Sequence, residues 1–205
     1  MPEQVLNYPD NVEPTAFTRA ELGWLPWLAP VPEENLTDRH YAGLTERGRA
    51  KSEYFRLLVH DPEVLGARTH TDKDIFYNSN GGLPRAEREL AAAAVSRSNG
   101  CIFCASVHAR FAAHYAKRPD EIDLLLREGI TAPLSSDWSL IAHTAEALSA
   151  TPSEFSEVQL TELLNAGYDE AEVLDLIYAS SFFNWANRLM LSLGEPTSPD
   201  RATRL

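Results

Sequence analysis

The chain of 205 residues lacks several features that would assign it to a large class of proteins. No apolar run approaches the roughly 18 residues that a membrane-spanning helix needs. The opening residues, Met1-Pro2-Glu3-Gln4, contain neither the basic nor the apolar region of a secretory signal peptide. Cations are few, since 18 Lys and Arg stand against 30 Asp and Glu, which gives a net charge of −12. We therefore expect a cytoplasmic protein with neither membranes nor nucleic acid among its partners.

Strand-like alternation of apolar and polar residues is also absent, and so are repeats and low-complexity segments. Apolar residues recur instead at helical spacing, with proline or capping residues before the periodic segments and glycine after several of them. The sequence therefore predicts an all-α fold. The expected helices cover residues 37–46, 49–60, 62–77, 84–98, 101–117, 119–128, 136–148, 156–166 and 169–193.

The ends of the chain differ in composition from this helical region. Residues 1–35 contain six prolines and the apolar cluster Trp24-Leu25-Pro26-Trp27-Leu28. This arm is expected to be irregular or to form short helices, and it must pack on its own core or on a neighbouring subunit. The sequence thus predicts an arm over 1–35, one helical domain over 36–195 and a tail over 196–205.

Cysteine is the scarcest chemically reactive residue, and the two present are three positions apart. Cys101-Ile102-Phe103-Cys104 begins a predicted helix and is followed by His108. At 100° per residue, Cys104 lies 60° and His108 about 20° from Cys101, so all three share one face. A helix start favours a thiolate through its free N–H groups and its dipole, and His108 follows Cys104 at the spacing that brings side chains together. The pattern indicates thiol redox chemistry.

A carboxylate is expected beside the imidazole. Glu89 lies on the preceding helix, which Asn99-Gly100 joins to the cysteine helix through a tight turn. Glu89 can then hydrogen-bond His108, which would give a carboxylate–imidazole–thiolate relay.

Other interpretations of these residues remain open. Cys101 and Cys104 would also suit a buried apolar pair, or half of a zinc site completed by His108 and a distant ligand. Glu89 alone would suit a solvated helix face. In the last helix, Asn184, Trp185, Asn187 and Arg188 interrupt an apolar pattern, which predicts a subunit contact or hydrogen bonds between helices.

The full spacing resembles a known family. Glu89, eleven residues, Cys101-x-x-Cys104, three residues and His108 match the signature of the AhpD-like alkylhydroperoxidases of the carboxymuconolactone decarboxylase superfamily. Leu83-Pro84-x-x-Glu87-x-Glu89-Leu90, Asp61-Pro62 and Phe183-Asn184-x-x-Asn187-Arg188 resemble the peroxidase-related subgroup. The resemblance covers about residues 15–195.

This resemblance implies an AhpD-like helical bundle, a homo-oligomer, and no need for haem, metal or another cofactor. It implies that Cys104 attacks a hydroperoxide, that Cys101 resolves the sulfenic acid as a disulfide, and that His108 and Glu89 move the protons. A separate dithiol or thioredoxin-like reductant would then restore the thiols. One departure stands at Phe103, where the best-studied relatives of this type have histidine.

We therefore expect a thiol-dependent peroxidase. The alternatives are a thiol redox switch or an oligomeric scaffold without turnover, and a decarboxylase- or isomerase-like enzyme that uses the same pocket. True decarboxylases of the superfamily usually lack the cysteine pair, which argues against lactone decarboxylation.

Overall fold

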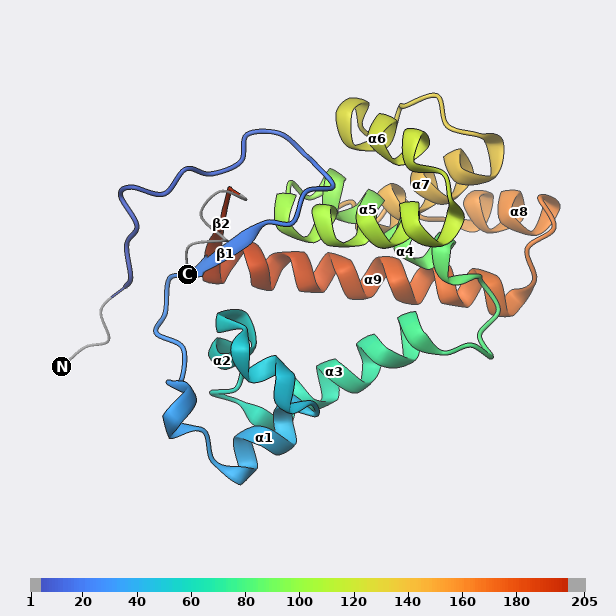
Figure 1. Ribbon diagram of the computed structural model, residues 1–205. Coiled ribbons are helices and arrows are strands. Elements are labelled where there is room, and N and C mark those ends of the chain that lie inside the picture. Colours follow the sequence, from blue (N-terminus) through green and yellow to red (C-terminus); the bar gives the residue numbers. More distant parts are fainter. Residues whose placement is uncertain (1–4, 199–205) are drawn as a thin grey trace.

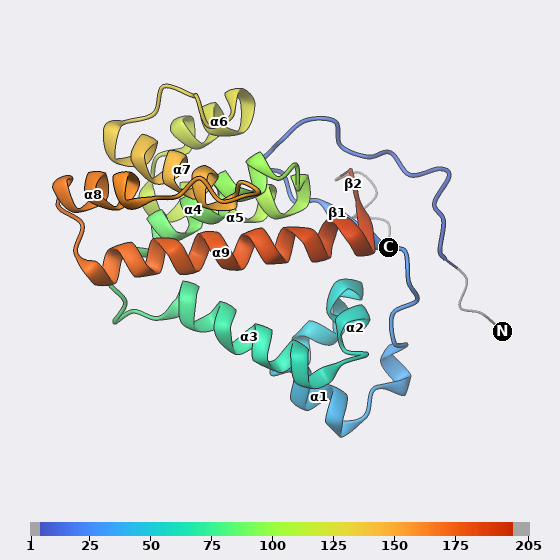
Figure 2. The ribbon, with the colours of Figure 1, turned by 180° about the vertical axis from the view of Figure 1, so that it is seen from behind.

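The computed structural model describes residues 5–198, and their fold is all-α, as the sequence predicts (Figure 1). One long helix, the last in the sequence, crosses the middle of the molecule. The first three helices lie on one side of it and the next five on the other (Figures 1 and 2). The nine α-helices of the described part are α1 (Asp38–Leu44), α2 (Glu53–Leu58), α3 (Pro62–Tyr77), α4 (Arg85–Ser98), α5 (Ile102–Ala116), α6 (Pro119–Glu128), α7 (Ser136–Ser149), α8 (Glu157–Asn165) and the central α9 (Glu170–Leu193).

Local signals fix where the helices begin. Asp61 precedes α3, and its carboxylate accepts the Val64 N–H at 3.2 Å, while Pro62 takes the first helical position, where no N–H is needed. Asp169 and Glu172 form a reciprocal capping box at the start of α9. These are the boundaries that the sequence predicts within one residue.

A tight turn joins α4 to α5. Asn99 caps α4, Gly100 follows with a φ of +78°, and the Cys101 N–H donates to the Ser96 carbonyl at 2.9 Å. This pattern of a left-handed residue after the helix and a bond back to its last turn is a Schellman motif. Cys101 therefore closes the Schellman motif of α4 and is also the N-cap of α5. The sequence predicts Cys101 inside the first turn, and the helix begins one residue later, at Ile102.

Small residues let α4 lie in the centre of the core. Ala91, Ala92, Ala93 and Ala94 are all fully buried, and α4 packs against α5, α7 and α9. Alanine permits this close approach because its side chain ends at Cβ. A second, smaller apolar cluster lies within the first helices and contains Val31, Leu44, Ala50, Val59 and Leu65.

Two short strands were not predicted. β1 (Gly23–Pro26) and β2 (Gly194–Thr197) pair antiparallel, from Gly23 opposite Thr197 to Pro26 opposite Gly194. Each strand has four residues and a proline, so neither offers the alternation on which strand prediction depends. The predicted tail over 196–205 thus begins inside a strand, and residues 199–205 lie outside the described part of the chain.

The N-terminal arm packs on its own chain. Trp24 and Leu25 are buried in this chain's core, and the Trp24 ring meets the Tyr54 ring edge-to-face at 5.4 Å between centroids. The helix predicted over 49–60 is divided in two: a 3₁₀ helix, η2 (Arg47–Lys51), is separated from α2 by the extended residue Ser52. A further 3₁₀ helix, η1, covers Glu33–Asn35. Because Ser52 is extended, η2 and α2 do not form one continuous helix.

Candidate functional site

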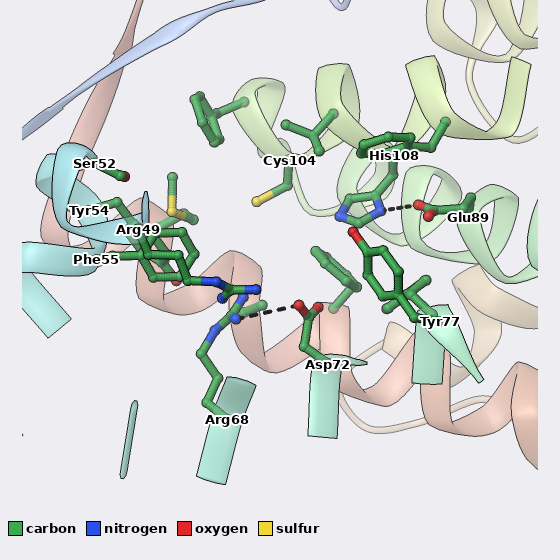
Figure 3. Close-up of a pocket in the computed structure, with 17 residues that line it drawn as sticks. Arg49, Ser52, Tyr54, Phe55, Arg68, Asp72, Tyr77, Glu89, Cys104 and His108 are labelled. Carbon is green, nitrogen blue, oxygen red and sulfur yellow. Dashed lines mark hydrogen bonds and ion pairs between the residues drawn. The ribbon is translucent and has the colours of Figure 1, made fainter. Parts of the chain in front are cut away.

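A cavity of about 350 Å³ lies between the first helices and the α5–α9 pair (Figure 3). α2 and α3 form one wall and α5 and α9 the other, while Glu89 of α4 reaches one end. Most lining side chains are apolar or aromatic. They are Arg49, Ser52, Tyr54, Phe55, Arg68, Asp72, Phe76, Tyr77, Glu89, Phe103, Cys104, Val107, His108, Phe111, Phe183, Ala186 and Met190.

The two cysteines differ in their access to this cavity. Both are free thiols, and both are buried. Cys104 lines the cavity and its sulfur points into it (Figure 3), whereas Cys101 is not among the lining residues. A molecule in the cavity therefore meets the Cys104 sulfur first.

The two thiols also differ in acidity. The pKa of Cys101 is lowered, mainly because the Cys104 thiol donates a hydrogen bond to the Cys101 sulfur. Burial raises this pKa, whereas hydrogen bonds from the Cys104 N–H and from Asn187 lower it further. The pKa of Cys104 is raised well above its ordinary value by that same hydrogen bond and then by burial, while Asn187 and the Arg68 charge oppose the increase. The two sulfurs therefore share one hydrogen bond, in which Cys104 holds its proton more tightly than Cys101 does.

The predicted contact between Glu89 and His108 is present. His108 Nδ1 lies 2.6 Å from Glu89 Oε2, and Arg85 donates to Glu89 Oε1 at 3.1 Å. Because a carboxylate only accepts hydrogen bonds, Nδ1 carries the proton and Nε2 is left as the basic nitrogen. Glu89 is 1% exposed, so it is a buried carboxylate and not a solvated one.

Aromatic rings hold the imidazole in place. The His108 ring lies 3.9 Å from the Phe183 ring and 5.4 Å from the Phe76 ring, measured between centroids. Its free nitrogen faces the cavity on the side of Cys104 (Figure 3). These two rings and the bond to Glu89 restrict the imidazole, so its free nitrogen has a defined direction in the cavity that Cys104 also lines.

Phe103 is half-buried, lines the cavity and packs against the core. Its benzyl ring neither accepts nor donates a proton. The imidazole that lines the same cavity is His108.

Several residues of the site were not found from the sequence. Asn187 was predicted only to have a buried partner, and it donates to Ser96 Oγ at 3.0 Å and accepts from Asn99 at 3.1 Å, in addition to its effect on Cys101. Asn99 also donates to Asn184. Of the two outcomes predicted for Asn184 and Asn187, the one found for both residues is therefore hydrogen bonding between helices. Arg68 and Arg85 were missed because charged residues on a helix are usually solvated.

Two absences among residues 5–198 bear on the remaining interpretations. This part of the chain contains no group of three or more His, Cys, Asp or Glu side chains arranged to hold a metal ion. Within the same range, every helix is too short or too polar to cross a membrane.

The segment that contains the site is similar to a known protein family. The model of the carboxymuconolactone decarboxylase family matches residues 62–137, which include Glu89, both cysteines and His108. The uncharacterized protein YdfG of Bacillus subtilis (strain 168) is 25% identical over 118 residues, 58% of this chain and 80% of that protein.

Solved structures share the fold at low identity. An AhpD-core, peroxidase-related protein from Ralstonia eutropha JMP134 has a TM-score of 0.69 and 22% identity over 83% of this chain and 92% of its own. A peroxidase-related protein from Silicibacter sp. TM1040 has a TM-score of 0.66 and 21% identity over 94% and 96%. The debrominase Bmp8 has a TM-score of 0.64 and 15% identity over 80% and 88%. The predicted AhpD-like fold is confirmed, and so is the predicted resemblance to the carboxymuconolactone decarboxylase family over residues 62–137.

Proposed function

Because residues 62–137 match the carboxymuconolactone decarboxylase family and include a cysteine pair, we propose that this protein reduces hydroperoxides through its thiols. One observation carries the proposal. A buried carboxylate–imidazole pair directs a basic nitrogen into a cavity whose wall includes one sulfur of a dithiol. Acid–base group, nucleophile and resolving thiol are thus within one site.

The first step transfers one oxygen. Cys104 gives its proton to His108 Nε2, and the thiolate attacks the terminal oxygen of the hydroperoxide. The O–O bond breaks, the alkoxide takes the proton back from His108 and leaves as an alcohol, and Cys104 becomes a sulfenic acid. Glu89 acts as a positioning residue, because it holds His108 in the tautomer that accepts the Cys104 proton.

The second step suits the lowered pKa of Cys101. The Cys101 sulfur attacks the Cys104 sulfur, the proton of the Cys101 thiol goes to the departing hydroxide, which leaves as water, and a disulfide forms. A more acidic resolving thiol gives up its proton more readily, which favours the disulfide over further oxidation of the sulfenic acid. A dithiol or thioredoxin-like donor then exchanges with the disulfide and is itself oxidised.

Chemistry on an aromatic halide is the second candidate. The debrominase neighbour has also been solved as a cysteine-to-alanine variant in complex with 2,3,4-tribromopyrrole. An aromatic-lined cavity of about 350 Å³ exceeds what hydrogen peroxide needs and suits a small ring. Attack of the Cys104 thiolate on a ring bromine would give a sulfenyl bromide and, with one proton, the debrominated ring. Cys101 would then form the disulfide and release bromide.

Turnover separates these candidates from a thiol switch. The reduced protein is mixed with a dithiol reductant and either hydrogen peroxide, cumene hydroperoxide or tribromopyrrole, and substrate loss is followed. We expect steady consumption of a hydroperoxide over many equivalents. A single equivalent consumed, followed by a stable disulfide that the reductant does not reopen, would indicate a switch, and bromide release in place of peroxide loss would favour the second candidate.

The order of attack is tested in the same assay. Cys101→Ser is expected to leave a sulfenic acid on Cys104 after one equivalent of peroxide, trapped by dimedone and located by mass spectrometry. Cys104→Ser is expected to react slowly, because Cys101 does not line the cavity. If Cys101 in Cys104→Ser is labelled at the wild-type rate, the two roles are reversed.

A further inference from the structure

We propose that the cavity selects hydroperoxides that carry a carboxylate, and that Arg68 is the residue that binds this carboxylate. The inference deepens the proposed function, because it names the substrate class of the same site. Arg68 lies on α3, across the cavity from the cysteine helix (Figure 3).

Arg68 is a buried cation with unused donors. Its side chain is 9% exposed, and its guanidinium points into the cavity (Figure 3). Nε and Nη1 are buried and have no hydrogen-bond partner. Such donors lose their water without gaining an acceptor, which is unfavourable, and more so for a charged group. A carboxylate presents two acceptor oxygens in the geometry that a guanidinium matches.

The groups around Arg68 do not replace that carboxylate. Asp72 forms an ion pair with Arg68, Oδ2 to Nη1 at 3.8 Å, which offsets part of the charge but is too long for a hydrogen bond and leaves Nε and Nη1 without acceptors. Tyr54 remains a neutral phenol at physiological pH, because burial raises its pKa to about 12, although the Arg68 charge and a hydrogen bond from Arg68 to the phenol act against this. The remaining contacts are aromatic faces, with the Phe182 and Phe55 ring centroids 5.3 and 5.9 Å from the guanidinium carbon.

A second cation increases the local excess of positive charge. The Arg49 guanidinium lies 4.7 Å from the same Phe55 ring and lines the cavity. Its ion pair with Glu46 is 3.6 Å long, and Glu46 is half exposed to solvent. The acidic group at the other end, Glu89, is bound by Arg85 and His108. Although the whole chain carries a net charge of −12, this end of the cavity attracts an anion.

The cavity's size and lining define the rest of the ligand. Its volume of about 350 Å³ is at the lower end of small-molecule pockets, and phenyl rings and aliphatic groups form most of its walls. Hydrogen peroxide would leave most of this apolar space unfilled. An apolar body with a carboxylate at one end and a hydroperoxide at the other would place the O–O bond at Cys104 while the carboxylate meets Arg68.

The test measures binding without turnover, so it does not depend on peroxidase activity. Calorimetric titration of the reduced protein compares 4-isopropylbenzoate with the isosteric neutral 4-isopropylbenzamide, and extends to benzoate, 4-phenylbutyrate and octanoate. We expect the benzoate to bind at least about tenfold more tightly than the amide, since a charge-assisted pair replaces unpartnered donors. Arg68→Met should reduce the difference to about twofold or less, and Arg68→Lys should retain part of it.

A matched control uses an arginine outside the cavity. Arg39 is exposed and pairs with Glu63 at 2.7 Å, so Arg39→Met removes one positive charge and should leave the preference unchanged. The wild-type comparison needs no variant, and far-UV circular dichroism checks that Arg68→Met remains folded. Equal binding of acid and amide by the wild type, or no carboxylate binding up to about 10 mM, would overturn the inference. So would a preference that survives in folded Arg68→Met.

The outcomes also separate this inference from the proposed function. A protein that consumes cumene hydroperoxide catalytically but shows no preference for the carboxylate keeps the function and loses the inference. A protein that binds the carboxylate through Arg68 but consumes no hydroperoxide keeps the binding site and loses the peroxidase proposal.

Discussion

In the proposed mechanism Glu89 and His108 act as one unit, because the carboxylate holds the imidazole through the 2.6 Å contact between Oε2 and Nδ1. Glu89→Gln and His108→Gln should each slow hydroperoxide consumption by roughly 10²–10⁴-fold, since the second removes the acid–base group and the first removes the carboxylate that holds it in place. The double variant should be little slower than either single variant. Stopped-flow rates on proteins of equal thermal stability check this, and multiplicative losses would mean that the two side chains act separately.

Phe103 cannot carry a proton, so we expect the rate of hydroperoxide consumption to depend on pH. The pKa of Cys104 is raised well above its ordinary value, so its thiolate fraction is small near neutrality and grows as pH rises. The wild-type rate should therefore increase from about pH 7 to about pH 9. Phe103→His adds a base beside the sulfur and should raise the rate most near pH 7.

The comparison needs one control, because Phe103 packs against the core and its loss removes apolar contacts. Urea unfolding of both proteins shows whether they are folded at each pH used. A wild type as fast at pH 7 as at pH 9, with no gain from Phe103→His, would mean that Cys104 ionises without further help.

At the scale of elements, the turn at Gly100 determines where Cys101 lies. A Cβ at Gly100 would meet no atom within 4 Å, so Gly100→Ala tests the backbone conformation alone. The φ of +78° should make this substitution destabilising by about 1–2 kcal/mol. Gly48→Ala is the matched control, since it also meets no atom and lies in η2 without a positive φ.

Urea unfolding at constant m value measures both changes. Gly48→Ala is expected to be neutral or slightly stabilising, because alanine restricts the unfolded chain more than glycine does. Equal destabilisation by the two substitutions would contradict the role assigned to the backbone conformation at Gly100.

The elements that the sequence predicted are those with local signals. Caps, prolines and glycines placed α3, α6 and α9 within one residue, and a fixed spacing brought Glu89, Cys104 and His108 onto facing positions of α4 and α5. Strand pairing between β1 and β2 depends on residues about 170 positions apart, which leave no local pattern. Arg68 faces the cavity only because α3 folds across α5 and α9, and its own helix looks like an ordinary solvated one.

For the whole molecule, the predicted homo-oligomer has a structural candidate for its contact. Leu174, Tyr178 and Trp185 of α9 are 47%, 54% and 42% exposed, and at 100° per residue they fall within 40° of one another. We expect the wild type to sediment as a species larger than the 22.8 kDa chain, and Tyr178→Glu with Trp185→Glu to yield the monomer. Charges on a contact face would face an apolar partner surface and cost binding free energy.

Leu160→Glu serves as the control for this experiment. Leu160 is also an exposed apolar residue, 38% accessible, but it lies on α8. Sedimentation velocity at several concentrations should show it assembled like the wild type. A wild type that sediments as a monomer at all concentrations would rule out the predicted homo-oligomer.

The pairing of β1 with β2 has a consequence for the order of synthesis. Gly23 is made 174 residues before its partner Thr197, and at roughly 5–20 residues per second this interval is about 10–35 s. During that time Trp24 and Leu25 have no strand to pair with, although both are buried in the finished protein. Tyr54, which lines the cavity, packs on Trp24. The cavity wall at Tyr54 therefore lacks part of its support until β2 has been made, and α5 with its two cysteines is made before that point.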